Sequence, residues 1–168
     1  RAGASMVPHL PAFLAGILAF MQRAVEAEAA PAIEGATVVN DVNCGRDNAA
    51  SALVRIVLAA PHVVDLTMAI PAIFSLLPCK LDHAEAALMY PELPKVYELA
   101  PQLVAPELPR LVAAVADHCA TGFLLEEVQD GLIAWLKHLA PLHPGVIEAA
   151  AAALPDAHRD IFMACMNK

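Results

Sequence analysis

The feature that most constrains the fold of this chain is the placement of its prolines. The sequence has 14 of them, and most stand just before a segment of helical periodicity rather than inside one. Proline is tolerated in the first turn of a helix, because the N–H that it lacks would have no intrahelical partner there. Clusters of β-branched residues are short, and no Asn-Gly or Asp-Gly hairpin turn occurs. The sequence therefore predicts an all-α fold of about seven to nine short helices in one domain, residues 1–168.

Apolar periodicity and helix-start residues give approximate bounds for these helices. We expect them at about 10–29, at 48–59, after Pro61 with a bend or break at Pro71, and at 81–90, 92–100, 107–119, 123–139, 145–153 and 156–166. The strongest pattern is the one over 123–139, in which the apolar residues share one face and the charged residues stay off it. A loop precedes residue 48, with Asp47 or Asn48 as the expected N-cap of the next helix.

One short motif occurs twice. Pro-Glu-Leu-Pro-Lys-Val at 91–96 is followed by Pro-Glu-Leu-Pro-Arg-Leu at 106–111. Two copies at this period are too few and too short for a solenoid built from sequence repeats. We favour a capping interpretation, in which proline fixes φ and the glutamate complements the positive end of the helix dipole. The alternative is a duplicated motif for binding a partner.

The chain is unusually apolar for its length. Hydrophobic residues make up 59% of the sequence and charged residues 17%, against roughly 25% charged residues in an ordinary globular chain. The longest uncharged stretches, Leu10–Met21 and Met68–Cys79, are interrupted by proline and are too short for a membrane span. The net charge of −8, without a basic cluster, argues against nucleic acid as a partner.

The four cysteines are spread over the whole chain. Cys44, Cys79, Cys119 and Cys165 are separated by 34, 39 and 45 residues, and no pair has the spacing of a zinc or redox motif. An even number of well-separated cysteines is typical of secreted proteins, so we expect two disulfides and a secreted or luminal location. Three pairings are open from the sequence. The alternative is four buried thiols in a protein of a reducing compartment.

No catalytic or metal-binding motif is recognisable in the sequence. His118 next to Cys119 suggests a Cys–His pair, but adjacent residues on a helix point in different directions, and a nucleophile needs its base within hydrogen-bond reach. His138 and His143 are separated by a proline and are not expected to share a helix face. We therefore expect no enzyme activity, no metal and no cofactor.

The apolar surplus favours a carrier with an internal cavity for a hydrophobic small molecule or lipid. The large apolar residues expected to line this cavity are Phe13, Ile17, Met21, Met68, Phe74, Phe123, Trp135 and Phe162. The alternative is a structural or assembly module, in which the surplus forms an exposed surface that pairs with a second copy or with a partner subunit. With seven histidines in the chain, such assembly would be sensitive to pH. An enzyme with an unrecognised site is the third hypothesis.

Overall fold

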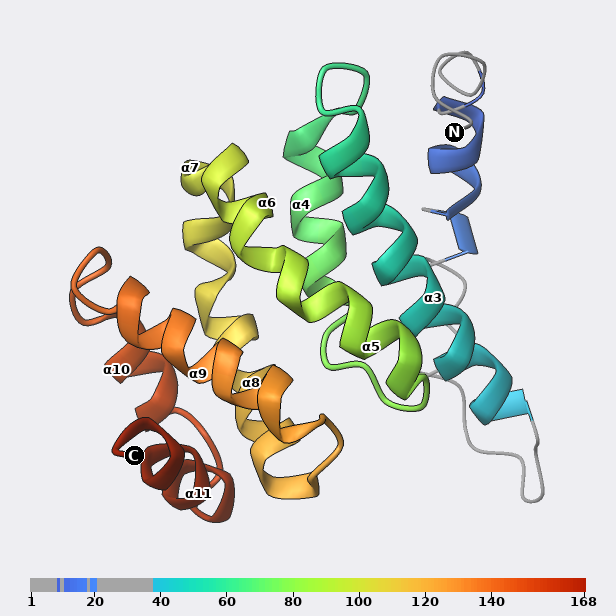
Figure 1. Cartoon of the computed structure of the whole chain (residues 1–168). Coiled ribbons are helices and arrows are strands. Elements are labelled where there is room, and N and C mark those ends of the chain that lie inside the picture. The colour runs from blue at the N-terminus through green and yellow to red at the C-terminus, as the bar shows by residue number, and fades with distance from the viewer. Residues whose placement is uncertain (1–8, 10, 18, 21–37) are drawn as a thin grey trace.

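Every regular element of the structure is a helix. The computed structural model describes residues 9, 11–17, 19, 20 and 38–168, and these contain no strand. The all-α prediction is therefore confirmed (Figure 1). Residues 11–17 begin the chain's helical part, and the elements that follow are α3 (Val38–Ala59), α4 (Leu66–Ser75), α5 (His83–Met89), the 3-10 helix η2 (Tyr90–Glu92), α6 (Leu93–Leu99), α7 (Pro101–Val104), the 3-10 helix η3 (Ala105–Glu107), α8 (Leu108–Thr121), α9 (Glu126–Leu139), α10 (Val146–Ala152) and α11 (Asp156–Met166).

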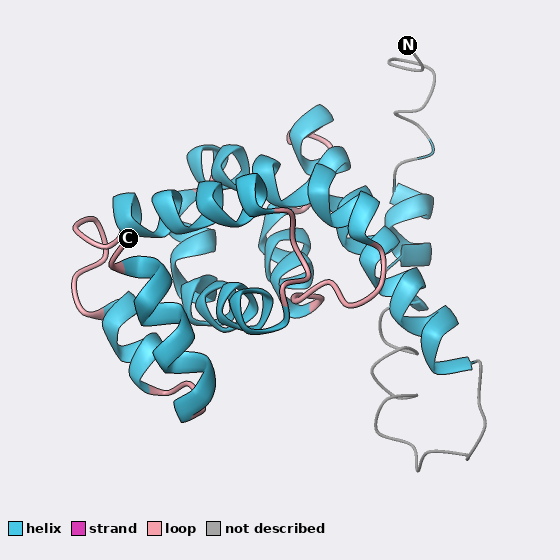
Figure 2. Cartoon of the chain, turned by 60° about the horizontal axis from the view of Figure 1, so that its bottom comes forward, coloured by secondary structure: helices cyan, strands magenta, loops and turns pink. Residues whose placement is uncertain are grey.

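These helices form two layers, and the chain passes from one layer to the other. In the first layer α3 packs on α5 and α6, and α9 packs on η2. In the second layer α4 packs on α7 and α8, and α8 packs on α10 and α11. The contacts of α3 with α4, of α6 with α7 and of α8 with α9 join the two layers. Figure 2 shows the two rows of helices from below.

The core lies between the two layers and takes side chains from nearly every helix. Its largest fully buried side chains include Phe74 of α4, Tyr90 of η2, Leu136 of α9 and Phe162 of α11. Helix α3 contributes Leu53, Val54 and Val57 of its second half, among others. Among the described residues, no helix is long and apolar enough to cross a membrane.

The repeated motif forms the same junction between a 3-10 helix and an α-helix twice. In each copy Pro-Glu closes a 3-10 turn and Leu-Pro opens an α-helix, so that η2 leads into α6 and η3 into α8. The motif leucines, Leu93 and Leu108, are both fully buried. Glu92 pairs with Lys95, and Glu107 pairs with Arg110, each across three residues. This supports the interpretation of the motif as helix-start chemistry.

Two local predictions are wrong. Helix α3 begins at Val38 rather than near residue 48, so Asp47 lies inside it and is not its N-cap. The buried Asp47 carboxyl group instead accepts hydrogen bonds from the backbone N–H groups of Lys80, Leu81 and Asp82, at 2.8–3.1 Å. Helix α4 continues through Pro71, so of the predicted bend or break at this residue the break is wrong; Ile70 and Phe74 on either side of it are buried in the core.

The expected disulfides are not formed. All four cysteines are free. Cys79 is buried, whereas Cys44 is exposed on α3 and its sulfur lies 3.9 Å from the Asp82 carboxyl group. Cys119 of α8 and Cys165 of α11 interact through their side chains but are not bonded. The packing of α11 on α8, through residues such as Phe162, thus stands without a covalent link.

Candidate ligand-binding groove

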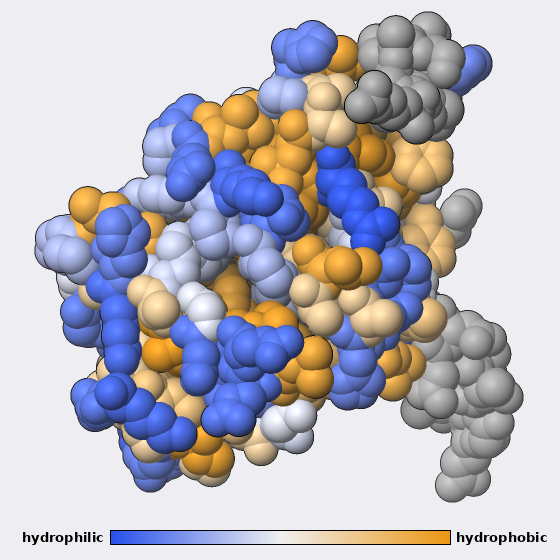
Figure 3. Space-filling view, in the orientation of Figure 1, coloured by the Kyte–Doolittle hydropathy of each residue, from blue (hydrophilic) through white to orange (hydrophobic). Residues whose placement is uncertain are grey.

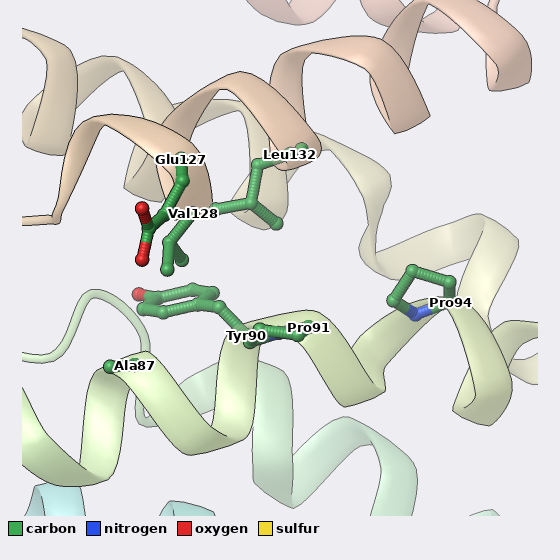
Figure 4. A pocket seen from close by; sticks show the side chains of 8 residues that line it. Ala87, Tyr90, Pro91, Pro94, Glu127, Val128 and Leu132 are labelled. Carbon is green, nitrogen blue, oxygen red and sulfur yellow. The ribbon is translucent and has the colours of Figure 1, made fainter.

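A groove between the η2 region and α9 is one of several concave sites in the described part of the structure, and its lining combines apolar residues with one exposed carboxylate. It has a volume of about 460 Å³ and is lined by Ala87, Tyr90, Pro91, Pro94, Glu127, Val128, Gly131 and Leu132. We call it the Tyr90 groove. Figure 4 shows that α5, η2 and α6 supply one wall and α9 the other. Figure 3 shows a hollow with apolar side chains at its bottom between these two walls.

Tyr90 closes the floor of the groove from beneath. Its side chain is fully buried, and its hydroxyl oxygen lies 2.6 Å from Nε2 of His118. The same oxygen accepts a hydrogen bond of 3.2 Å from the backbone N–H of Cys79. Burial raises the pKa of Tyr90 well above its ordinary value of 10.0. The phenol is therefore neutral and held in place, and it ties α8 and the segment before α5 to the groove.

His118 is the polar centre of this network. It is fully buried on α8, and burial lowers its pKa from 6.5 to about 4, so the ring is neutral at pH 7. Because the Tyr90 hydroxyl faces Nε2, the Nδ1 atom is left buried without a hydrogen-bond partner. The ring stacks on Phe123, whose ring in turn stacks on His83 at a centroid distance of 4.0 Å.

Glu127 is the accessible charged residue of the groove. It lies in the first turn of α9 and is exposed. Figure 4 shows its carboxyl group directed toward the side of the groove on which the Tyr90 hydroxyl lies. The other lining residues, apart from Tyr90, are Ala, Pro, Val, Gly and Leu. The groove thus combines an apolar surface with one exposed carboxylate.

Because residue 131 is a glycine, α9 presents no side chain to the groove at this position. It is exposed in the interior of α9, and a Cβ atom built on it meets no atom within 4 Å. Glycine in the interior of a helix costs roughly 0.5–1 kcal/mol relative to alanine. Neither its backbone angles nor a close neighbour requires glycine at this position. Because Gly131 lines the groove, a larger side chain at this position would take up part of its open space.

The comparisons with known proteins give no family. No protein-family model matches the chain, and neither a curated protein nor a solved structure matches it significantly. The function therefore has to be inferred from the geometry.

The residues predicted to line a cavity are not brought together in one. Phe74 and Phe162 are fully buried in the core, and Trp135 is buried on α9 with its ring against the edge of Tyr97. Phe123 is half-buried between His83 and His118. None of these four residues lines the Tyr90 groove.

Four residues of that prediction remain, and the three that the structure describes lie toward the N-terminus or on α4. Phe13 and Ile17 line a second groove against α3, of about 610 Å³, together with Phe20 and Gly45. Met68 is exposed and lines a third groove beside α4. The predicted residue Met21 lies outside the described part of the chain. We call the groove of Phe13 and Ile17 the N-terminal groove.

The neighbouring residues His118 and Cys119 face different partners. His118 bonds to Tyr90, whereas Cys119 interacts with Cys165 on α11. Burial, reinforced by Cys165, raises the pKa of the Cys119 thiol to about 12, which disfavours the nucleophilic thiolate. In the part of the chain that the structure describes, no group of three or more His, Cys, Asp or Glu side chains could hold a metal ion.

Sequence reasoning missed Tyr90, Glu127 and Gly131 as groove residues. Tyr90 and Glu127 come from different helices, and nothing local indicates that these helices are neighbours. The one available signal was Gly131, because a glycine in the middle of the strongest amphipathic pattern is unfavourable without a packing or functional reason.

Proposed function

We propose that the protein is a non-enzymatic binding protein that takes a small hydrophobic molecule into the Tyr90 groove. The observation that carries this proposal is the lining, which is apolar except for the exposed Glu127 carboxylate and the buried Tyr90 phenol. Sites for small molecules are concave and mostly apolar, with few polar groups and volumes of about 300–1,000 Å³. The volume of about 460 Å³ lies in this range.

The walls of the groove support binding because their side chains are already held in place. Tyr90 is fixed by His118 and by the backbone of Cys79, and Leu132 is buried in the core. A preformed site does not have to spend binding free energy on ordering its own side chains. The N-terminal groove is larger but more open, and it is the competing location.

Two glycines offer a matched test of the location. Gly131 lines the Tyr90 groove and Gly16 the N-terminal groove, and each has open space where a side chain would project. In a titration with the neutral fluorophore Nile red, we expect the full chain to bind one equivalent. Gly131→Leu should weaken binding at least about tenfold by filling the groove, since a change of 1.4 kcal/mol is tenfold in affinity. Gly16→Leu should leave it unchanged.

The opposite pattern would move the site to the N-terminal groove, where Phe13 and Ile17 lie. Absence of Nile red binding by the folded chain, together with a concentration-dependent oligomer in sedimentation, would replace the proposal by the assembly function. Native mass spectrometry of the purified chain reports bound ligand and oligomeric state in one measurement. Neither protein variant should lose helix content, because leucine has a better helix propensity than glycine.

The secreted location does not follow from this proposal. It was expected on the ground of two disulfides, and the four free cysteines remove that ground.

A further inference from the structure

We infer that the ligand of the Tyr90 groove is an organic cation, with an apolar body and one protonated amine that meets Glu127. This inference rests on the proposed function and adds the chemical class of the ligand. The groove offers an apolar surface formed by Pro91, Val128 and Leu132, among others, and an exposed carboxylate. No lysine, arginine or histidine lines it.

Of the side chains that line the groove, one is available to bind a polar group of the ligand. Tyr90 lines the groove, but its hydroxyl group is buried and already engaged with His118 and with the N–H of Cys79. The Glu127 carboxylate is therefore the accessible side chain that can take a hydrogen bond from a ligand. Hydrogen bonds in which one partner is ionised are roughly twice as strong as neutral ones, and an ammonium donor adds its Coulomb attraction to the carboxylate.

The helix N-terminus does not reverse this preference. The first turn of α9 carries a partial positive charge equivalent to roughly half an elementary charge, which by itself attracts anions. Glu126 and Glu127 both lie in this turn, and each brings a full negative charge. The local balance is therefore negative. The net charge of −8 over the whole chain adds a weak long-range attraction for cations.

Three probes with the same apolar body separate the contributions of charge and shape. They are 2-naphthylmethylammonium, neutral 2-naphthylmethanol and 2-naphthoate, each titrated into the full chain while the backbone amide signals of α9 are followed by NMR. We expect the cation to bind about fivefold more tightly than the neutral probe at low salt, as for a partly exposed ion pair, and the anion to bind most weakly. The shifts should centre on Val128 and Gly131.

Glu127→Gln should bring the affinity for the cation down to that for the neutral probe and leave the neutral probe unaffected. Glu126→Gln is the matched control, because Glu126 is also an exposed glutamate of the same turn but does not line the groove. In this control the preference for the cation should persist, with a change of less than about twofold.

The outcomes distinguish this inference from the function on which it rests. Equal binding of the cation and the neutral probe at α9 would overturn the inference and leave the proposed function standing. A preference for the cation that falls equally in Glu126→Gln and Glu127→Gln would also overturn it, because it would reflect general surface charge. If none of the probes shifts the α9 amides, both the inference and the proposed function fail.

Discussion

Protonation of His118 makes the free energy of unfolding depend on pH. Its pKa is about 4 in the folded chain, against an ordinary value of 6.5, chiefly because of burial, with a small further lowering from His83. The neighbouring carboxyl groups of Asp117 and Asp47 act in the opposite direction, but burial dominates. Between these two pH values the unfolded chain binds a proton that the folded chain does not bind, so stability falls as the pH falls.

We expect the free energy of unfolding from His118 to be fully present above pH 6.5 and to decrease by about 3 kcal/mol toward pH 4. Urea unfolding at a series of pH values measures this slope. His118→Gln keeps a hydrogen-bonding side chain but cannot take up a proton, so its profile should be flatter over the same range. The exposed His62 gives the control, and a His62→Gln profile that flattens equally would contradict the assignment to His118.

Gly131 and Gly122 look alike in the sequence but should respond oppositely to alanine. Gly131 lies in a helix interior with open space around it, so Gly131→Ala should raise the free energy of unfolding by about 0.5–1 kcal/mol. Gly122 ends α8 with φ +65°, where a Cβ is unfavourable, so Gly122→Ala should lower it by about 1–2 kcal/mol. Thermal unfolding of the two variants measures both signs, and a loss of stability in Gly131→Ala would show that the groove wall is tighter than described.

At the scale of elements, Asp47 connects α3 to the start of α5. Its carboxyl oxygens accept the N–H groups of three consecutive residues, 80–82, and Asp82 then caps α5 through the N–H of Glu85. Asp47→Ala removes the buried acceptor that these partly buried hydrogen bonds share, and we expect a loss of about 3 kcal/mol in denaturant unfolding. Asp65→Ala removes the exposed N-cap of α4 and should cost about 1 kcal/mol. If Asp47→Ala and Asp65→Ala lower the free energy of unfolding equally, the Asp47 carboxyl group contributes no more than a single exposed N-cap.

In the two copies of the repeated motif, burial rather than charge should carry the stability. Leu108 is fully buried, whereas the Glu107–Arg110 ion pair at 2.6 Å has its arginine side chain more than half exposed. Leu108→Ala should therefore cost about 2–5 kcal/mol of unfolding free energy. Glu107→Gln should cost less than about 0.5 kcal/mol, measured by the same denaturant titration. A large effect of Glu107→Gln would show that the ion pair also stabilises this helix start.

Apart from the one-turn helix α7, the α-helices after residue 80 could be predicted because their signals are local. Apolar periodicity places α8 and α9 at 107–119 and 123–139, within a few residues of the observed bounds. The first half of α3 could not be predicted, because its polar residues suggest a loop and Asp47 resembles an N-cap. The actual partners of Asp47 lie 33–35 residues further along the chain, which no local pattern shows.

At the scale of the whole molecule, the reactivity of the four cysteine thiols tests whether the fold is stable without disulfides. We expect four thiols to react under denaturing, non-reducing conditions. In the folded chain at pH 8, the exposed Cys44 should react first. Cys79 and Cys119 should react slowly, because burial raises the pKa of both thiols, that of Cys119 to about 12. Titration with a chromogenic disulfide reagent measures this, and fewer than four thiols before reduction would restore the disulfide prediction.

The candidate site depends on long-range packing, and for this reason the sequence could not indicate it. Phe74 and Phe162 were predicted from size and hydrophobicity to line a cavity, but the same properties suit a side chain for the core, where both lie. The groove instead lies where η2 meets α9, and only the contact between these elements places Tyr90 near Glu127.

The alternation of the helices between the two layers has a consequence for local unfolding. Helix α11 contacts α8, α9 and α10, whereas α3 contacts α4, α5 and α6. A helix at the end of the chain can open locally at a lower free energy than the whole fold. Detachment of α11 would expose Phe162 while α3 and α4 keep their mutual contacts. We therefore expect the chain to fray first at its C-terminal helix, with amide hydrogen exchange slowest in α8, where Leu111, Val112 and Val115 are fully buried.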